Sequence, residues 1–194
     1  MNKRVAGPPP ERNITLIGMP GAGKSTVGVV LAKKLSLTFV DTDILIQARQ
    51  GRSLQQILES DGYKELRQLE EQEILRLQVE HSVIATGGSA VYSARAMEHL
   101  QRISTIVYLD LPYADICRRI HDFATRGIAC APEQSFEELY IERGRLYRTY
   151  AEVTICEPNA TQDEVADLII SQLHKTHMGT YMGEEGEGNQ FSAP

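Results

Sequence analysis

The chain has 194 residues, 42% of them hydrophobic, and a formal net charge of −6. The negative charge argues against a nucleic-acid-binding protein, because proteins that bind phosphate backbones usually present a basic face. No run approaches the roughly 18 apolar residues of a membrane span, and the N-terminal residues lack the apolar segment of a signal peptide. We therefore expect a monomer in the cytoplasm, with no nucleic-acid or membrane partner.

One domain of ordinary size is expected, flanked by two segments without a core. Residues 1–12 contain three consecutive prolines and are predicted to form an extended, disordered arm. Residues 178–194 are rich in Gly and Glu and predict a disordered acidic tail. The residues between them, 13–177, are predicted to form a single domain. Its three cysteines are odd in number and lack CxxC spacing, which favours reduced thiols.

Apolar runs and helical periodicity alternate along this domain. In chain order we expect strand 13–19, helix 24–36, strand 38–43, helices 43–50, 53–60 and 63–80, strand 82–86, helix 94–102, strand 104–111, helices 113–123 and 135–151, strand 152–156 and helix 161–175. Most of the strands lack period-two alternation, which favours an α/β fold with a parallel sheet covered on both faces. Ligands of such folds bind beyond the carboxyl ends of the strands.

The stretch GMPGAGKST, residues 18–26, follows the first predicted strand and opens the first helix. It fits the pattern G-x-x-x-x-G-K-[ST], whose backbone N–H groups surround a phosphate. Lys24 is expected to reach the β and γ phosphates of a nucleotide, and the Ser25 hydroxyl to bind Mg²⁺. The remaining nucleotide-binding candidates in the loop are Gly21, Ala22, Gly23 and Thr26. The loop alone does not separate a kinase from a GTPase or a motor ATPase.

Two carboxylates, Asp41 and Asp43, close the second predicted strand. Strand alternation would place both on the same side. Near a magnesium nucleotide, one could hold water on the metal while the other accepts a proton from an attacking hydroxyl. The alternative is that both simply cap the helix that follows.

Two further features could bind a second substrate. Arg67 lies on the long helix with Glu70 three residues on, a spacing that allows contact but also suits an ordinary surface ion pair. Gly87 and Gly88 follow the third strand and permit close approach of the backbone to a ligand, or form a simple turn.

Arg119, Arg126 and Arg143 form the last group of candidates, although most helical arginines are merely solvated. Arg126 lies beside Gly127 in a loop that could close over a nucleotide and bring the guanidinium to its phosphates. The five histidines show no metal-like spacing on one face.

These residues resemble the shikimate kinase family of P-loop small-molecule kinases over roughly residues 13–174. The family's phosphate loop is matched by residues 18–26 and its D-x-D by Asp41 and Asp43. The stretch DGYKELRQLE matches a second family motif, whose arginine and glutamate are Arg67 and Glu70 here. The stretch GGS lies at the position of the family's glycine triplet. The stretch RGRLY matches a further motif and contains Arg143 and Tyr147.

The resemblance implies a five-stranded parallel sheet in the order 2-3-1-4-5, a three-layer sandwich, and a mobile lid over about 120–133. It implies that ATP, with Mg²⁺, phosphorylates the 3-hydroxyl of shikimate in aromatic amino-acid synthesis.

The site residues that the resemblance implies fall into two groups. On the acceptor side, Asp43, Arg67, Gly88 and Arg143 would bind shikimate, and Asp43 would orient or deprotonate its hydroxyl. On the ATP side, Lys24 and Arg126 would stabilise the transferred group, Ser25 and Asp41 would serve Mg²⁺, and Arg119 would contact adenine.

Three positions differ from the family pattern: Leu66 replaces an aromatic residue, Ser89 the third glycine, and residues 127–129 the lid's Pro-Leu-Leu. All three concern the acceptor side or the lid. A kinase for gluconate or another hydroxy acid or polyol therefore stays open, as does a non-catalytic nucleotide-binding regulator. A regulatory GTPase is disfavoured because the chain lacks an N-K-x-D base-reading element.

Overall fold

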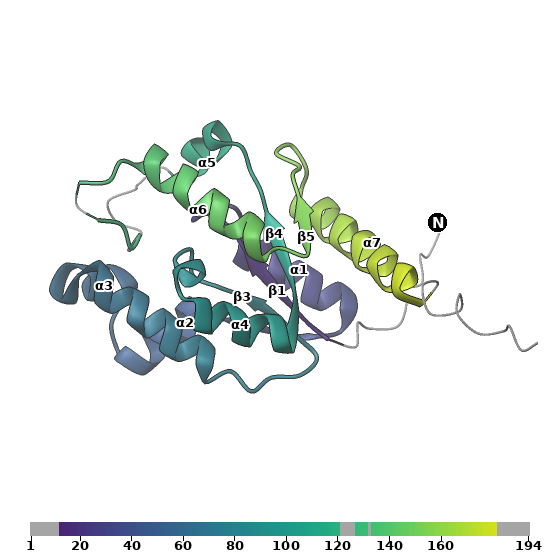
Figure 1. Ribbon diagram of the computed structural model, residues 1–194, viewed down its shortest axis with the longest axis horizontal. Coiled ribbons are helices and arrows are strands. Elements are labelled where there is room, and N and C mark those ends of the chain that lie inside the picture. The colour runs from purple at the N-terminus through teal and green to yellow at the C-terminus, as the bar shows by residue number, and fades with distance from the viewer. Residues whose placement is uncertain (1–11, 121–126, 132, 182–194) are drawn as a thin grey trace, which may run out of the picture.

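A five-stranded parallel sheet forms the centre of the computed structural model, which describes residues 12–120, 127–131 and 133–181. The strand order is β2-β3-β1-β4-β5 (Figure 1). The strands are β1 (Asn13–Ile17), β2 (Thr38–Asp41), β3 (Ser82–Ala85), β4 (Ser104–Leu109) and β5 (Val153–Ile155). The predicted α/β class, strand order and parallel pairing are confirmed.

Continuous burial explains why the sheet showed no alternation in sequence. Every residue of β1, β3 and β4 is buried, because each of these strands has a neighbour on both sides and helices cover both faces. Within the described residues, no helix is both long enough and apolar enough to cross a membrane.

The helices are α1 (Lys24–Leu35), α2 (Thr42–Gln50), α3 (Leu54–Leu75), α4 (Ala94–Ile103), α5 (Tyr113–Arg119), α6 (Phe136–Tyr150) and α7 (Gln162–Tyr181), with a 3-10 turn η1 (Ala90–Tyr92). Helix α3 joins two helices that were predicted separately, across a break at Gly62, where φ is 84°. The prediction that helix extends to residue 80 was wrong, because Leu77 packs into the core from beyond the end of α3. Helix α5 ends at Arg119, and residues 121–123 of the helix predicted there lie outside the described residues.

The order of the strands fixes which face each helix covers. The connection from β1 to β2 runs in one direction along the sheet, and the connections from β3 to β4 and from β4 to β5 run in the other. Since such crossovers are right-handed, α1 lies on one face and α4 and α6 on the opposite face. Contacts agree: α7 packs on α1, whereas α4 and α6 contact β4 and lie in front of the sheet in Figure 1.

A second, smaller cluster of buried side chains lies beside the main core. It consists of Ile46, Ile57, Leu66 and Ala129. Ala129 belongs to residues 127–131, and Gly127 N donates to Gln55 Oε1 at 2.8 Å. The segment that follows the predicted lid arginine is therefore packed on α3, with Ile128 and Ala129 buried.

The expected domain boundaries at residues 12 and 177 stay predictions, although α7 continues to Tyr181. Arg126 lies outside the described residues, as do residues 121–125 and 132 of the predicted lid.

Candidate active site

The predicted phosphate loop leads from β1 into α1, at the carboxyl end of the central strand. Gly23 is the N-cap of α1 with φ 96°, a left-handed conformation that favours glycine. The Lys24 ammonium is buried and donates to the carbonyls of Gly18, at 2.8 Å, and Met19, at 3.0 Å. Burial lowers the pKa of Lys24 to about 8, against the opposing effect of the Asp43 carboxylate. The loop therefore offers an N-terminal helix end and a cation, which together suit an anion.

A cavity of about 550 Å³ lies over this loop, and we call it the phosphate pocket. It is lined by Pro20, Gly21, Gly23, Lys24, Ser25, Thr26, Asp43, Thr86, Arg119 and Gln162. Most of the residues predicted to contact the nucleotide thus line one cavity, together with the predicted base. Ala22 instead lines an adjoining hollow with Val27, Leu111 and Ile155.

Arg119 lines both the phosphate pocket and this adjoining hollow. Its Nη2 donates to the carbonyl of Pro158 at 3.1 Å. The contact holds the guanidinium between a polar cavity and an apolar one.

Asp41 links the phosphate loop to α2. The Ser25 hydroxyl donates to Asp41 Oδ2 at 2.6 Å, and Asp41 Oδ1 accepts from the backbone of Asp43 and Ile44. Asp41 is thus the N-cap of α2, so the capping interpretation is right for this residue.

Asp43 lies in the predicted site, but on a helix and not on a strand. Because the strand ends at Asp41, Asp43 lies in the first turn of α2, and the argument from strand alternation was wrong. Its carboxylate still lines the phosphate pocket, and Oδ1 is buried without a hydrogen-bond partner. Burial raises the pKa of Asp43 to about 7, and the nearby charges of Glu70 and Asp41 add to this effect.

The turn after β3 brings backbone close to several of these side chains. A Cβ atom on Gly87 would overlap the carboxylate of Glu70 and lie 2.8 Å from Asp43 Oδ1. A Cβ atom on Gly88 would lie 2.9 Å from both Arg143 Nη1 and Pro20 Cδ. The predicted close approach at these glycines is therefore an approach to charged side chains and to the phosphate loop.

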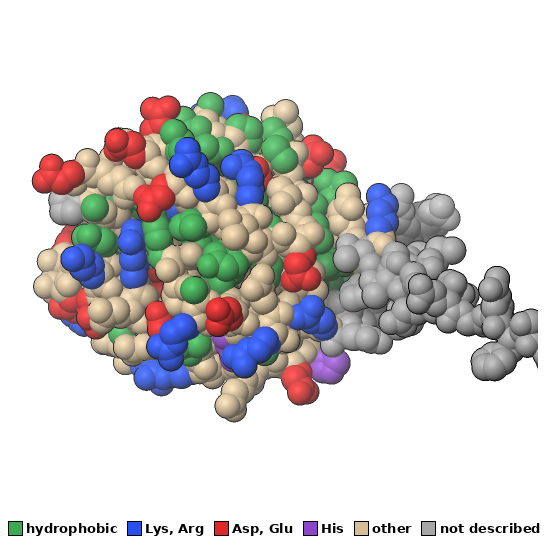
Figure 2. Space-filling view, in the orientation of Figure 1, with side chains coloured by type: hydrophobic (Ala, Val, Ile, Leu, Met, Phe, Trp, Pro, Cys, Tyr) green, Lys and Arg blue, Asp and Glu red, His purple; other side chains and the backbone are tan. Residues whose placement is uncertain are grey.

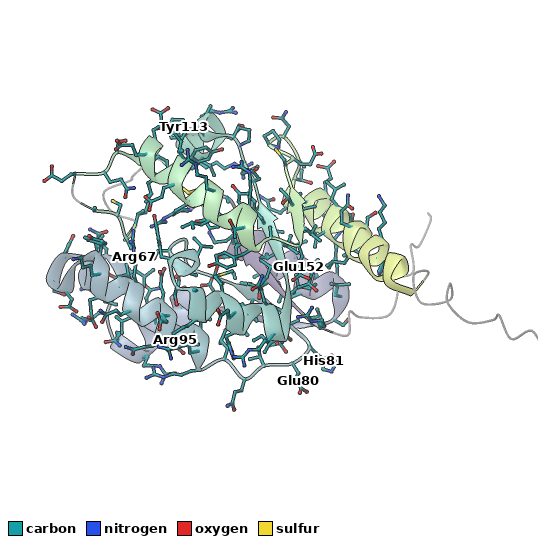
Figure 3. The ribbon with its side chains drawn as sticks, in the orientation of Figure 1. Arg67, Glu80, His81, Arg95, Tyr113 and Glu152 are labelled. Atoms are coloured by element: carbon teal, nitrogen blue, oxygen red, sulfur yellow. The ribbon has the colours of Figure 1, made fainter. Side chains whose placement is uncertain are left out.

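Arg67 and Arg143 come from α3 and α6 and converge on one oxygen atom. Their Nη2 atoms donate to the carbonyl of Ala129, at 3.2 Å from Arg67 and 2.6 Å from Arg143. Figure 3 shows Arg67 between α3 and α6. The Nε atom of each guanidinium is buried without a hydrogen-bond partner. We call this pair the arginine clamp; its buried, unpaired donors are the kind of group that a bound anion satisfies.

Glu70 is buried and accepts a hydrogen bond from the Ser89 hydroxyl. The expected contact between Glu70 and Arg67 is not made as a hydrogen bond or ion pair among the described residues, although the two charges interact at longer range. Burial raises the pKa of Glu70, and the hydrogen bond from Ser89 opposes this shift. The carboxylate thus belongs to the acceptor region and not to the helix surface.

Two tyrosines that contact the arginine clamp were not among the predicted site residues. The Arg67 guanidinium carbon lies 3.7 Å from the ring centroid of Tyr92 and 5.1 Å from that of Tyr63. Tyr63 precedes Arg67 by four residues on the same helix, so helical spacing could have found it. No local pattern points to Tyr92, because it follows a different strand.

Comparisons with known proteins agree on one family. The sequence profile described as shikimate kinase matches residues 20–174. The shikimate kinase of Mycobacterium avium (strain 104) is 36% identical over 164 residues, 83% of this chain and 93% of that protein. The shikimate kinase of Paracidovorax citrulli is 39% identical over 151 residues, 75% of this chain and 82% of that protein. The solved shikimate kinase from Acinetobacter baumannii in complex with shikimate has a TM-score of 0.79 and 32% identity, covering 85% of this chain and 94% of that one.

Proposed function

This chain belongs to the shikimate kinase family, and we propose that it transfers the γ-phosphoryl group of ATP to the 3-hydroxyl of shikimate. The observation that carries the proposal is the arginine clamp, in which two guanidinium groups hold one oxygen beside the phosphate pocket. Such an arrangement suits a small acceptor that has both a carboxylate and a hydroxyl group.

The ATP side of the reaction would use the phosphate loop and its flanks. Lys24 would release the loop carbonyls that it now contacts and bind the β and γ phosphates, where its charge offsets that of the transferred group. Arg119 would lie against adenine, since it borders the apolar hollow next to the phosphates. Arg126, outside the described residues, stays a prediction as the second cation on the transferred group.

Ser25 and Asp41 fit a magnesium site. Mg²⁺ prefers oxygen ligands and keeps several waters, so one or two protein oxygens beside a phosphate are enough. The hydrogen bond of 2.6 Å between Ser25 and Asp41 brings the two oxygens together, and Ser25 lines the phosphate pocket. Water and phosphate oxygens would supply the remaining ligands. When bound, the ion would neutralise phosphate charge.

The acceptor would place its carboxylate in the arginine clamp. A carboxylate oxygen would replace the Ala129 carbonyl, and the unpaired Nε donors would find partners. Leu66, the replacement for the family's aromatic residue, packs against Ala129 in the smaller core cluster. Leu66 would therefore influence the arginine clamp indirectly, by positioning residues 127–131.

Asp43 would accept the proton of the acceptor's hydroxyl group. Its Oδ1 is buried and unpaired, and it lies in the same cavity as Lys24. A pKa near 7 suits a general base at neutral pH, because about half of the population is ionised and the carboxylate is basic enough to take a proton.

The kinase for gluconate or another polyol acid is the weaker alternative, since the related proteins above are shikimate kinases. A location in the cytoplasm is supported by two points. The proposed reaction consumes ATP, and the three cysteines are free thiols, as is usual in a reducing compartment. The monomeric state stays a prediction.

A coupled assay of ADP release tests the function. The purified protein, with ATP and Mg²⁺, is given shikimate, gluconate, quinate and a neutral polyol in parallel. We expect turnover with shikimate to exceed that with every other acceptor. Turnover with gluconate alone, or an ATPase rate that no acceptor changes, would refute the proposal.

A further inference from the structure

The arginine clamp brings two like charges together in a buried place. Arg143 is 1% exposed, and its Nη2 meets the same oxygen as that of Arg67. A neutral carbonyl offsets little of this repulsion, and Glu70 attracts the two guanidinium groups only at longer range, without a hydrogen bond or ion pair to Arg67 among the described residues. Other groups must therefore keep the two guanidinium planes in place while the clamp holds no carboxylate.

The ring of Tyr92 contacts both members of the clamp. The guanidinium carbon lies 3.7 Å from the ring centroid for Arg67 and 5.4 Å for Arg143. Both distances fall within the range of about 6 Å in which the negative face of an aromatic ring attracts a cation. By the same measure Tyr63 is in range of Arg67 only.

The position of Tyr92 in the chain links this ring to the rest of the site. Tyr92 ends the short turn η1, and its N–H donates to the carbonyl of Ser89 at 3.0 Å. Gly88, which approaches the phosphate loop, lies two residues before this turn in the same connection. The ring is thus held by the connection that joins the clamp to the phosphate pocket.

We propose that Tyr92 is a positioning residue for the acceptor's carboxylate: its ring fixes the Arg67 and Arg143 guanidinium groups so that they bind this anion together. The inference rests on the proposed function, because it assumes a carboxylate in the clamp. Burial raises the pKa of Tyr92, so the phenol stays neutral. Its hydroxyl is buried without a hydrogen-bond partner among the described residues, so the attraction comes from the face of the ring. Tyr92 does not itself take part in phosphoryl transfer.

The test compares Tyr92→Leu and Tyr92→Met with Tyr92→Phe. Loss of the ring should raise the KM for shikimate roughly 5- to 30-fold, the range expected for a desolvated cation–π contact, and leave the KM for ATP within about twofold. Tyr92→Phe keeps the ring and should restore the wild-type KM. Tyr150→Leu removes another half-buried ring, at the end of α6, and should change neither constant. An equal rise in both KM values, or a Phe variant as weak as the Leu variant, would overturn the proposal.

A second measurement separates electrostatic positioning from the shape of the pocket. Binding of shikimate and of its neutral carboxamide is measured by calorimetry for the wild type, Tyr92→Leu and Tyr92→Met. Loss of the ring should weaken binding of the acid and leave that of the carboxamide nearly unchanged. Equal weakening of both ligands would show that the ring only fills space, and would overturn the proposal. If the wild type itself neither binds nor phosphorylates shikimate, the proposed function is refuted. If the wild type is active and the Tyr92 variants behave like it, only the role of Tyr92 is refuted.

Discussion

The hydroxyl of Ser89 donates a hydrogen bond to the buried carboxylate of Glu70. Ser89 replaces the third glycine of the family's triplet and so adds a side chain on the acceptor side. Its side chain is 3% exposed and turned toward Glu70. The extra side chain therefore satisfies a carboxylate inside the site.

Ser89→Ala should lower the free energy of unfolding by about 1–3 kcal/mol, because it leaves the buried Glu70 carboxylate without this donor. Urea unfolding of the ligand-free protein measures the change. Ser171→Ala, at an exposed position on α7, is the matched control and should stay within about 0.5 kcal/mol of the wild type. Equal stability of the Ser89 and Ser171 variants would show that the hydrogen bond contributes nothing.

Glu70→Gln should stabilise the ligand-free protein increasingly as the pH rises. The pKa of Glu70 is raised on folding, chiefly by burial, so its stabilising contribution is complete below its unfolded pKa of about 4.3. This contribution is lost as the pH rises through the folded value. Glutamine has no proton to lose, and the neighbouring Asp43 is relieved of a like charge.

The measurement is urea unfolding of both proteins at several pH values between about 4 and 8, with a chelator present. The charged groups around Glu70 are Lys24, Asp43, Arg67 and Arg143, and they are the same in both proteins. A stability difference that shrinks with rising pH would contradict the prediction.

Asp43→Asn should reduce kcat by roughly 10²- to 10⁴-fold, the usual loss for a general base. The KM for ATP should change little, because the amide has nearly the same shape as the carboxylate. Release of ADP with saturating shikimate measures the effect. Asp61→Asn, which alters a carboxylate paired with Arg52 outside the site, is the control and should keep wild-type activity. Wild-type turnover in Asp43→Asn would remove the assignment as base.

Arg143→Lys should raise the KM for shikimate roughly 10- to 100-fold, because an ammonium retains the charge but loses the planar fork. The KM for ATP should stay within a few-fold of the wild type. Arg102→Lys, at an exposed position on α4, serves as the matched control. Parallel increases in both KM values would place Arg143 outside the acceptor site.

Much of the fold could be predicted because its signals are local. A buried strand, a glycine-rich turn and an amphipathic helix each impose a pattern on neighbouring residues, and residues 18–26 combine all three. Ends of elements were predicted less well. The strand predicted to reach residue 43 ends at Asp41, because the side chain of Asp41 caps the start of α2. The helix predicted to reach residue 80 ends at Leu75, although Leu77 continues its apolar pattern.

The surface gives little further guidance, since Figure 2 shows acidic, basic and apolar side chains interspersed on the face in view. The informative charges are buried. Lys24, Glu70 and Arg143 are buried and Asp43 is partly buried, and each influences the pKa of another member of the group.

The sequence by itself determined the phosphate loop, the α/β class and the identity of the charged residues, because these depend on backbone preferences and periodicity within short windows. Only the tertiary structure decided which group each charge meets. Glu70 accepts its hydrogen bond from Ser89, in the turn after β3, and not from Arg67 on its own helix. The two arginines of the clamp both donate to the carbonyl of Ala129. The physical reason is that helical spacing merely permits a contact, whereas desolvation makes a buried charge depend on whatever donor or acceptor the packing of distant segments places beside it.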